Sequence, residues 1–266
     1  MMKWEVQNNT ISKLYVKERN LIHPWGIETA DSSAFFSLED GFGYRYSLLG
    51  EEKYHDDKTF RYTCRVEMQE GSWDLFLYDR IIDNSRVLRT ARLLCLKDSY
   101  FMDFVMRFCF HKHFFPKAQI AGYTYHHRNT NVYYQYPTSK VSLNGESEKI
   151  IIHVQKSSSP EQLKPHMYVR DNNQQWVVHA RMLPTRWEKE VIKLCNNWAQ
   201  TRPLPQCLSN LILSSKKAKK ALWYRGERSP FTGKILKRIN PAAFPMVLLK
   251  KGQELYWQVE MEVQNC

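Results

Sequence analysis

Histidine, tyrosine and arginine residues recur at alternating positions of several β-type segments, and such side chains can transfer protons or bind metals near neutral pH. The pattern is clearest in the segment 100–114. Read with the two-residue period of a strand, one side holds Met102, Phe104, Met106, Phe108 and Phe110, and the other holds Asp103, Val105, Arg107, Cys109, His111 and His113. We expect the first side to lie in the core. The second side is polar, but we do not expect it to be an ordinary solvent-exposed surface.

The candidate catalytic residues, if the protein is an enzyme, come from this side and from similar positions of later strands. If these sides coincide, one surface would be lined by Arg107, His111, His113, Tyr125, His127 and His153, with His179 beside them. Two histidines at 111 and 113 could be metal ligands, but no carboxylate follows them closely in the sequence, so we do not expect a metal. We expect no other cofactor either. A solvent-facing or aromatic-stacked sheet explains the same residues, because histidine, tyrosine and arginine are good cross-strand neighbours.

A second candidate site is a basic segment near the C-terminal end. The chain has 39 basic and 27 acidic residues, and the window 212–251 contains eleven of the former against one acid, Glu227. The predicted polyanion-binding residues are Lys216, Lys217, Lys219, Lys220, Arg225 and Arg228, with the aromatic residues Trp223 and Tyr224. Clustered cations release counterions from nucleic acids, and aromatic rings stack on bases. A solvated, lysine-rich helix end is an equally good interpretation, and anionic lipid is a weaker third one.

Other diagnostic patterns are absent from the sequence. There is no G-x-S-x-G motif, no phosphate-binding glycine loop and no pair of carboxylates at a hydrolase spacing. Six cysteines at irregular spacings, with no C-x-x-C, suggest neither a zinc framework nor a redox pair. The first twenty residues are charged and no long apolar run occurs, so we expect a cytoplasmic protein with no membrane span.

The elements that position these residues are mainly β-strands. Period-two alternation between short polar turns predicts strands at 42–49, 60–68, 73–82, 86–96, 100–113, 119–127, 131–136, 149–155, 175–182 and 255–263. Residues 13–17 could form a further short strand, and 23–26 are predicted to be a turn or loop. Short turns make neighbouring strands antiparallel, so we expect a meander curved into a barrel or a two-layer sandwich.

Helical periodicity begins only after Pro184. Thr185 and Glu188 fit a capping box, which predicts a helix that ends at Pro203 and a second helix from near Pro205 toward Gly226. We therefore divide the chain into a β-rich domain, 1–184, and a part, 185–266, whose helices, basic arm and final strand pack on the same core.

Two functional hypotheses from different classes follow. The first is a cytosolic binding protein whose basic, aromatic-containing surface engages a polyanion, with nucleic acid as the favoured partner. The alternative is a small-molecule enzyme or carrier that uses a barrel interior lined by histidine, tyrosine and arginine, with a small hydrophobic or aromatic ligand. A subunit of a larger assembly with no chemistry of its own is a third possibility, and the sequence leaves open whether the protein is an enzyme.

Overall fold

The computed structural model describes residues 2–30, 34–39, 43, 45–68, 71–101, 103–128, 133–172, 174–184, 222–223, 244–245 and 247–266. These residues form β-strands almost throughout. The one helical element among them is the 3-10 turn η1, Lys112–Phe114.

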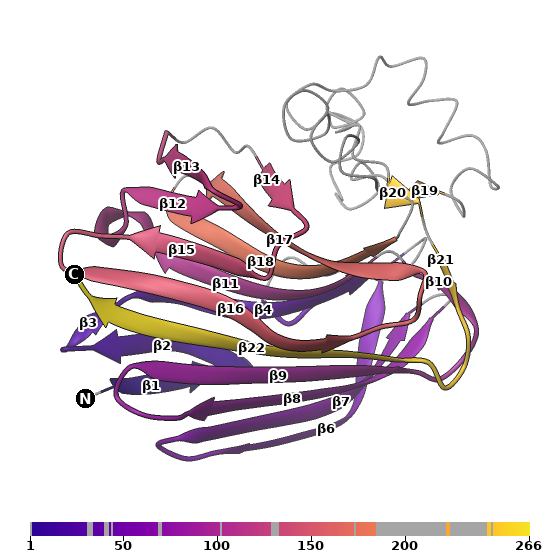
Figure 1. Cartoon of the computed structure of the whole chain (residues 1–266). Coiled ribbons are helices and arrows are strands. Elements are labelled where there is room, and N and C mark those ends of the chain that lie inside the picture. Colours follow the sequence, from indigo (N-terminus) through magenta and orange to yellow (C-terminus); the bar gives the residue numbers. More distant parts are fainter. Residues whose placement is uncertain are drawn as a thin grey trace, which may run out of the picture.

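The larger of the two main sheets, called the large sheet below, has nine strands in the order β13-β12-β15-β16-β22-β9-β8-β7-β6. Their bounds are Tyr46–His55 (β6), Thr59–Met68 (β7), Ser72–Ile81 (β8), Arg86–Cys95 (β9), Lys117–Ile120 (β12), Tyr123–His126 (β13), Lys140–Asn144 (β15), Glu148–Ser158 (β16) and Glu254–Asn265 (β22). Short turns join β6 to β9 in sequence order, so these neighbours are antiparallel. The strand β22 lies between β9 and β16 and connects the two halves of the sheet (Figure 1).

The other main sheet, called the small sheet, has six strands in the order β14-β17-β18-β11-β4-β5. Their bounds are Ile22–Ala30 (β4), Phe35–Ser37 (β5), Phe104–His111 (β11), Tyr133–Tyr136 (β14), Leu163–Asn172 (β17) and Gln175–Pro184 (β18). The strand β4 bulges against β11, because its pairing shifts between Arg107 and Cys109. Pro24 lies in this bulge, where a residue without a backbone N–H is tolerated.

Three further groups of strands complete the described chain. The N-terminal sheet consists of Met2–Gln7 (β1), Thr10–Val16 (β2) and Arg19–Asn20 (β3). Two short pairs join Ser99–Phe101 (β10) to Val247–Leu249 (β21), and Leu222–Trp223 (β19) to Phe244–Pro245 (β20). The N-terminal sheet is fixed to the small sheet in part by Thr10, whose hydroxyl donates to the carbonyl oxygen of Trp25 at 2.5 Å.

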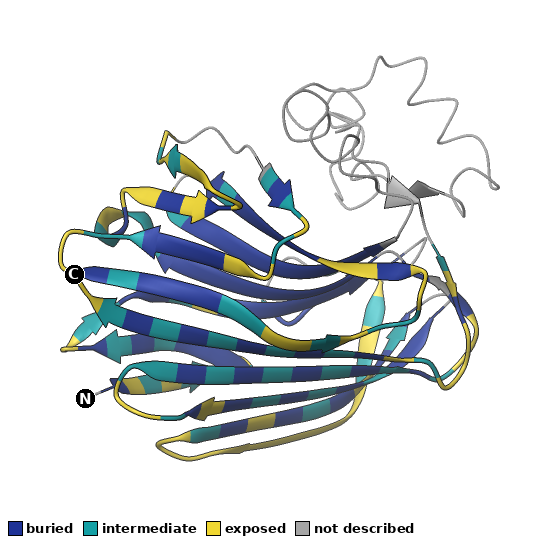
Figure 2. Cartoon of the chain, in the orientation of Figure 1, coloured by how far each residue is buried: buried dark blue, intermediate teal, exposed yellow. Residues whose placement is uncertain are grey.

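The large and small sheets pack face to face, and their inner sides form one hydrophobic cluster. Trp257 of β22 donates from Nε1 to the carbonyl oxygen of Phe104 in β11 at 3.2 Å, which links the two layers directly. Along β8, β9 and β22, buried and partly exposed residues alternate, whereas β11 is buried on both sides from Phe104 to Phe110 (Figure 2). The large sheet therefore exposes its outer side, and the centre of the small sheet is buried on both.

The sandwich is one of the two architectures predicted from the sequence, and the barrel is wrong. In the described part of the chain neither main sheet closes on itself: β13 and β6 are the edges of the large sheet, and β14 and β5 those of the small sheet. The predicted meander breaks after β9, because β11 pairs with β4 and β18 in the other layer.

Most predicted strands are confirmed, and the errors concern particular segments. Residues 23–26 lie inside β4 rather than in a turn. The segment 119–127 is two strands, β12 and β13, since Ala121 and Gly122 form a tight turn with φ of 50° and 82°. The first strand of the large sheet runs over Tyr46–His55 rather than 42–49, and β15 and β17 were missed. Their polar composition hid them.

The predicted C-terminal helices lie outside the described residues, except at Leu222–Trp223. There the backbone forms β19 instead of the expected helix. No helix in the described part of the chain is long and apolar enough to cross a membrane. The division at residue 184 stays a prediction, although β22, from beyond that boundary, is a central strand of the large sheet.

Candidate functional site

The outer side of the small sheet gathers ionisable side chains that are almost completely buried. The strand register places His179 of β18 beside Arg107 of β11, and Tyr168 of β17 beside His179. The group called the polar face below consists of Glu28, Glu39, Asp103, Arg107, His166, Tyr168, His179 and Arg181. The relative exposure of each is 8% or less, except for the Glu39 side chain at 16%. Burial of this many charges requires that they pair with one another.

Arg107 forms ion pairs with two carboxylates. Its guanidinium contacts the carboxylate of Glu39, which follows β5, and lies 3.8 Å from Oε1 of Glu28 in β4. Gly26 lies directly across from Arg107, and a Cβ at that position would be in ordinary van der Waals contact with the Cβ of Arg107, at 3.5 Å. The charge of Arg107 is therefore matched within the polar face.

A second set of contacts runs across the three strands β11, β18 and β17. Arg181 donates from Nε and Nη2 to Oδ2 of Asp103, at 2.6 Å in each case. The Arg181 guanidinium also lies 5.9 Å from the ring centre of Tyr168. The hydroxyl of Tyr168 is 3.3 Å from Nε2 of His179, and the two ring centres are 4.2 Å apart. A carboxylate, a guanidinium, a phenol and an imidazole are thus held in fixed positions.

His166 completes the polar face at its β17 end. It is 3% exposed and lies opposite Arg181 in the strand pairing. Burial, with the nearby charges of Arg181 and Lys164, lowers the pKa of His166 to about 4, so the imidazole is neutral near pH 7. Its buried Nδ1 has no hydrogen-bond partner among the described residues.

The residues predicted from sequence to be catalytic do not converge on one surface. Arg107 belongs to the polar face. His111 ends β11 on the same side, and His113 follows in η1 and is exposed. His153 pairs with Lys140 and Glu260 and lies on the outer side of the large sheet, across the sandwich from the polar face.

Tyr125 and His127 join the edges of the two main sheets. Tyr125 of β13 stacks on Tyr134 of β14 with ring centres 3.6 Å apart, and its hydroxyl is 2.6 Å from that of Tyr136. Burial and this hydrogen bond raise the pKa of Tyr125. Nε2 of His127 lies 3.0 Å from Oδ1 of Asp171.

The predicted interior lined by histidine, tyrosine and arginine is wrong, because an apolar core fills the space between the two main sheets.

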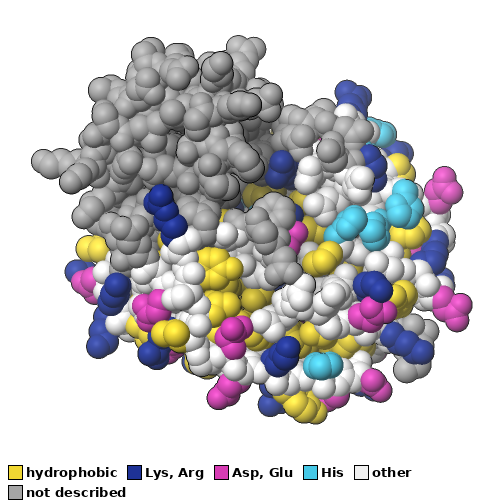
Figure 3. Space-filling view, turned by 180° about the vertical axis from the view of Figure 1, so that it is seen from behind, with side chains coloured by type: hydrophobic (Ala, Val, Ile, Leu, Met, Phe, Trp, Pro, Cys, Tyr) yellow, Lys and Arg dark blue, Asp and Glu magenta, His cyan; other side chains and the backbone are white. Residues whose placement is uncertain are grey.

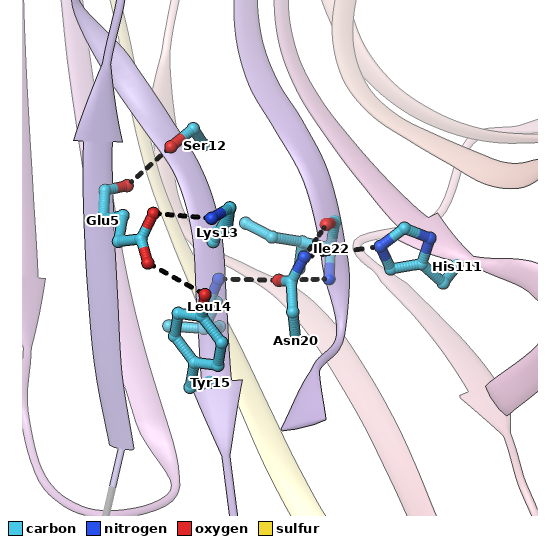
Figure 4. A network of polar contacts seen from close by, with 8 residues as sticks. All are labelled: Glu5, Ser12, Lys13, Leu14, Tyr15, Asn20, Ile22 and His111. Carbon is cyan, nitrogen blue, oxygen red and sulfur yellow. Dashed lines mark hydrogen bonds and ion pairs between the residues drawn. The ribbon is translucent and has the colours of Figure 1, made fainter. Parts of the chain in front are cut away.

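Three histidines meet where the N-terminal sheet reaches β11. The ring centre of His111 lies 3.8 Å from that of His23 and 5.4 Å from that of His113. Asn20 connects this group to β4, since its Nδ2 donates to the carbonyl oxygen of Ile22 and lies 3.4 Å from Nε2 of His111 (Figure 4). Burial, then the two neighbouring imidazoles, lower the pKa of His111 to about 4. No group of three or more His, Cys, Asp or Glu side chains among the described residues could hold a metal ion.

Five members of the polar face were missed by sequence reasoning: Glu28, Glu39, His166, Tyr168 and Arg181. A signal was present in β17, where His166, Tyr168 and Arg170 alternate with the buried Met167 and Val169. The same period links His179 and Arg181 in β18. The alternation within each strand does not show which strands are neighbours, and the strand order is what brings these positions together.

The residues predicted to bind a polyanion lie outside the described residues, apart from the backbone of Trp223 in β19. On the described surface seen in Figure 3, lysine and arginine side chains are interspersed with aspartate and glutamate. The continuous basic surface stays a prediction.

The fold belongs to the class of antiparallel sandwiches with two large facing sheets. No protein-family model and no curated protein matches the chain. Among solved structures, it is similar to a protein from Escherichia coli K12 described as a "Putative aldose 1-epimerase", with a TM-score of 0.52 and 7% sequence identity over 100% of this chain and 96% of that one. At this identity the likeness concerns the fold alone.

Proposed function

We propose that this chain binds a small sugar on the polar face. The observation that carries the proposal is the set of buried, mutually paired carboxylates, guanidinium groups and imidazoles on the outer side of β4, β11, β18 and β17. Sugar hydroxyl groups both donate and accept hydrogen bonds, so they suit a face that offers acceptors on Glu28 and Glu39 and donors on Arg107 and Arg181. The similar Escherichia coli fold, named for an activity on aldoses, is consistent with this ligand class.

The chemistry to test first after binding is exchange between sugar anomers. Opening an aldose ring requires one group that removes the proton of the anomeric hydroxyl and one that protonates the ring oxygen. The polar face contains both kinds of group: carboxylates as bases, and the Tyr168–His179 pair, whose hydroxyl and imidazole can pass a proton. A carrier would bind the same ligand without changing the exchange rate.

The direct test is a panel of common aldoses titrated into the full-length protein by calorimetry and by ligand-observed NMR. Saturable binding of at least one aldose at or below millimolar concentration supports the proposal. Absence of binding across the panel would overturn it. Magnetisation exchange between the anomer signals, measured in the same samples, separates an enzyme from a carrier.

Replacing Glu39 by glutamine should weaken sugar binding by about tenfold to a hundredfold. Glu39 is the most exposed carboxylate of the polar face, so a ligand can reach it, and a hydrogen bond to a charged group contributes roughly 1.5–3 kcal/mol. Glutamine keeps the shape, and Glu28 remains beside Arg107, so the fold should persist.

The matched control is Glu260→Gln. Glu260 is exposed to a similar degree, 20%, but lies on the outer side of the large sheet. It should leave both affinity and thermal unfolding unchanged. Equal affinities for the two variants would place the sugar elsewhere on the molecule.

A further inference from the structure

We infer that His166 is a ligand-binding residue of the polar face, and that the sugar it accepts is uncharged rather than a sugar phosphate or a uronic acid. This inference rests on the proposed function. It begins with Nδ1 of His166, a buried polar atom without a hydrogen-bond partner among the described residues. An unsatisfied buried donor or acceptor costs about 1–3 kcal/mol. A bound hydroxyl group would supply the missing partner.

The position of His166 agrees with this role. It lies opposite Arg181 in the strand pairing, next to the contacts that join Arg181 to Asp103 and to Tyr168. Its backbone is in β17, a strand paired along its length with β18, so the imidazole is carried by a rigid element. A ligand in contact with Nδ1 would also be close to Tyr168.

The charges of the polar face determine the class of sugar. Arg107 is paired with Glu39 and Glu28, and Arg181 with Asp103, so the buried cations are already neutralised by carboxylates. His166 itself is neutral near pH 7. The polar face contains three carboxylates and two guanidinium groups, so a phosphate or carboxylate brought into it would add negative charge to a group that is already net negative, and burial of such a charge is strongly unfavourable. An uncharged sugar has no such cost.

The experiment compares ligands and variants together. Wild-type protein, His166→Gln and His153→Gln are titrated with a neutral hexose, its 6-phosphate and its uronic acid. His153 is the matched control, because it is a histidine on the outer side of the large sheet. We expect the wild type and His153→Gln to bind the neutral hexose at least tenfold more tightly than either anion, and His166→Gln to bind it about tenfold more weakly.

A measurement on the wild-type protein tests the inference even if the His166→Gln variant fails to fold. In protein labelled with ¹⁵N-histidine, the neutral hexose should shift the Nδ1 resonance of His166 and leave that of His153 in place. If the hexose binds but this resonance does not move, His166 does not contact the sugar. If the phosphate or uronic acid binds more tightly than the neutral hexose, the ligand class is wrong while the proposed function stands. If no sugar binds at all, the proposed function itself fails.

Discussion

Replacing Arg89 by methionine should lower the free energy of unfolding by about 3–5 kcal/mol, the usual cost of removing one partner of a buried ion pair. Arg89 and Asp79 face each other across β9 and β8, and both are completely buried, with Nε and Oδ1 3.5 Å apart. The guanidinium lies 5.5 Å from the ring of Trp25 and 5.9 Å from that of Phe108, both of which belong to the small sheet. Methionine would leave the Asp79 carboxyl in this apolar layer without its cation.

The pKa of Asp79 indicates how unfavourable that layer is for charge. Burial raises it to about 6, even though Arg89 acts in the opposite direction. Replacing both residues, as Asp79→Leu with Arg89→Met, should therefore restore most of the lost stability, because no unpaired charge remains. Urea unfolding of the two single variants and the double variant measures this coupling.

Arg80→Met is the matched control for these variants. Arg80 is the next residue along β8 from Asp79 and is exposed, so its loss should change stability by less than about 0.5 kcal/mol. A double variant as unstable as the arginine variant alone would contradict the account, since it would show that packing volume, and not charge, sets the cost.

The second large effect is expected in acid. His111 should make the folded protein less stable as the pH falls from 6.5 toward 4, because the unfolded chain binds a proton at His111 near its ordinary pKa while the folded chain does so only at about 4. Below about 4 His111 is protonated in both states, and its effect ends. The lowered pKa of His166 acts in the same direction, and the raised pKa of Asp79 acts in the opposite direction below about pH 6. The contribution of His111 is at most about 3 kcal/mol, and partial exposure of the ring reduces it.

The groups around His111 oppose its protonation in the folded protein. His23, whose pKa burial also lowers, and His113 are both in ring contact with it, so successive protonations would place like charges side by side. Urea unfolding of wild type and His111→Asn at pH 7 and pH 4.5 tests this. The variant should lose less stability between the two pH values than wild type, and His55→Asn, an exposed change on β6, should behave as wild type. Identical pH profiles for wild type and His111→Asn would show that His111 does not cause the loss of stability in acid.

The sequence contains enough information to predict the large sheet strand by strand over 60–95. There the alternation of inward and outward residues is regular, as in Phe60, Tyr62 and Cys64 of β7, and the turns are short. It fails where burial on both sides erases the alternation, as in β4, and where polar residues face a covered surface, as in β17. Arg107 could be identified because its own strand alternates. Its partners could not, because Glu28 and Glu39 precede it by many residues and reach it only through the order of strands in the small sheet.

The place of β22 also bears on how the chain acquires its structure during synthesis. In the large sheet, β22 separates the strands β6 to β9 from the strands β12, β13, β15 and β16, and it is synthesised after all of them. While the ribosome is still translating residues before 254, β9 and β16 each have one side without a neighbour, and such edges can pair with other chains. We therefore expect the large sheet to be completed only after β22 has left the ribosome, and β9 and β16 to be exposed edges of the nascent chain until then.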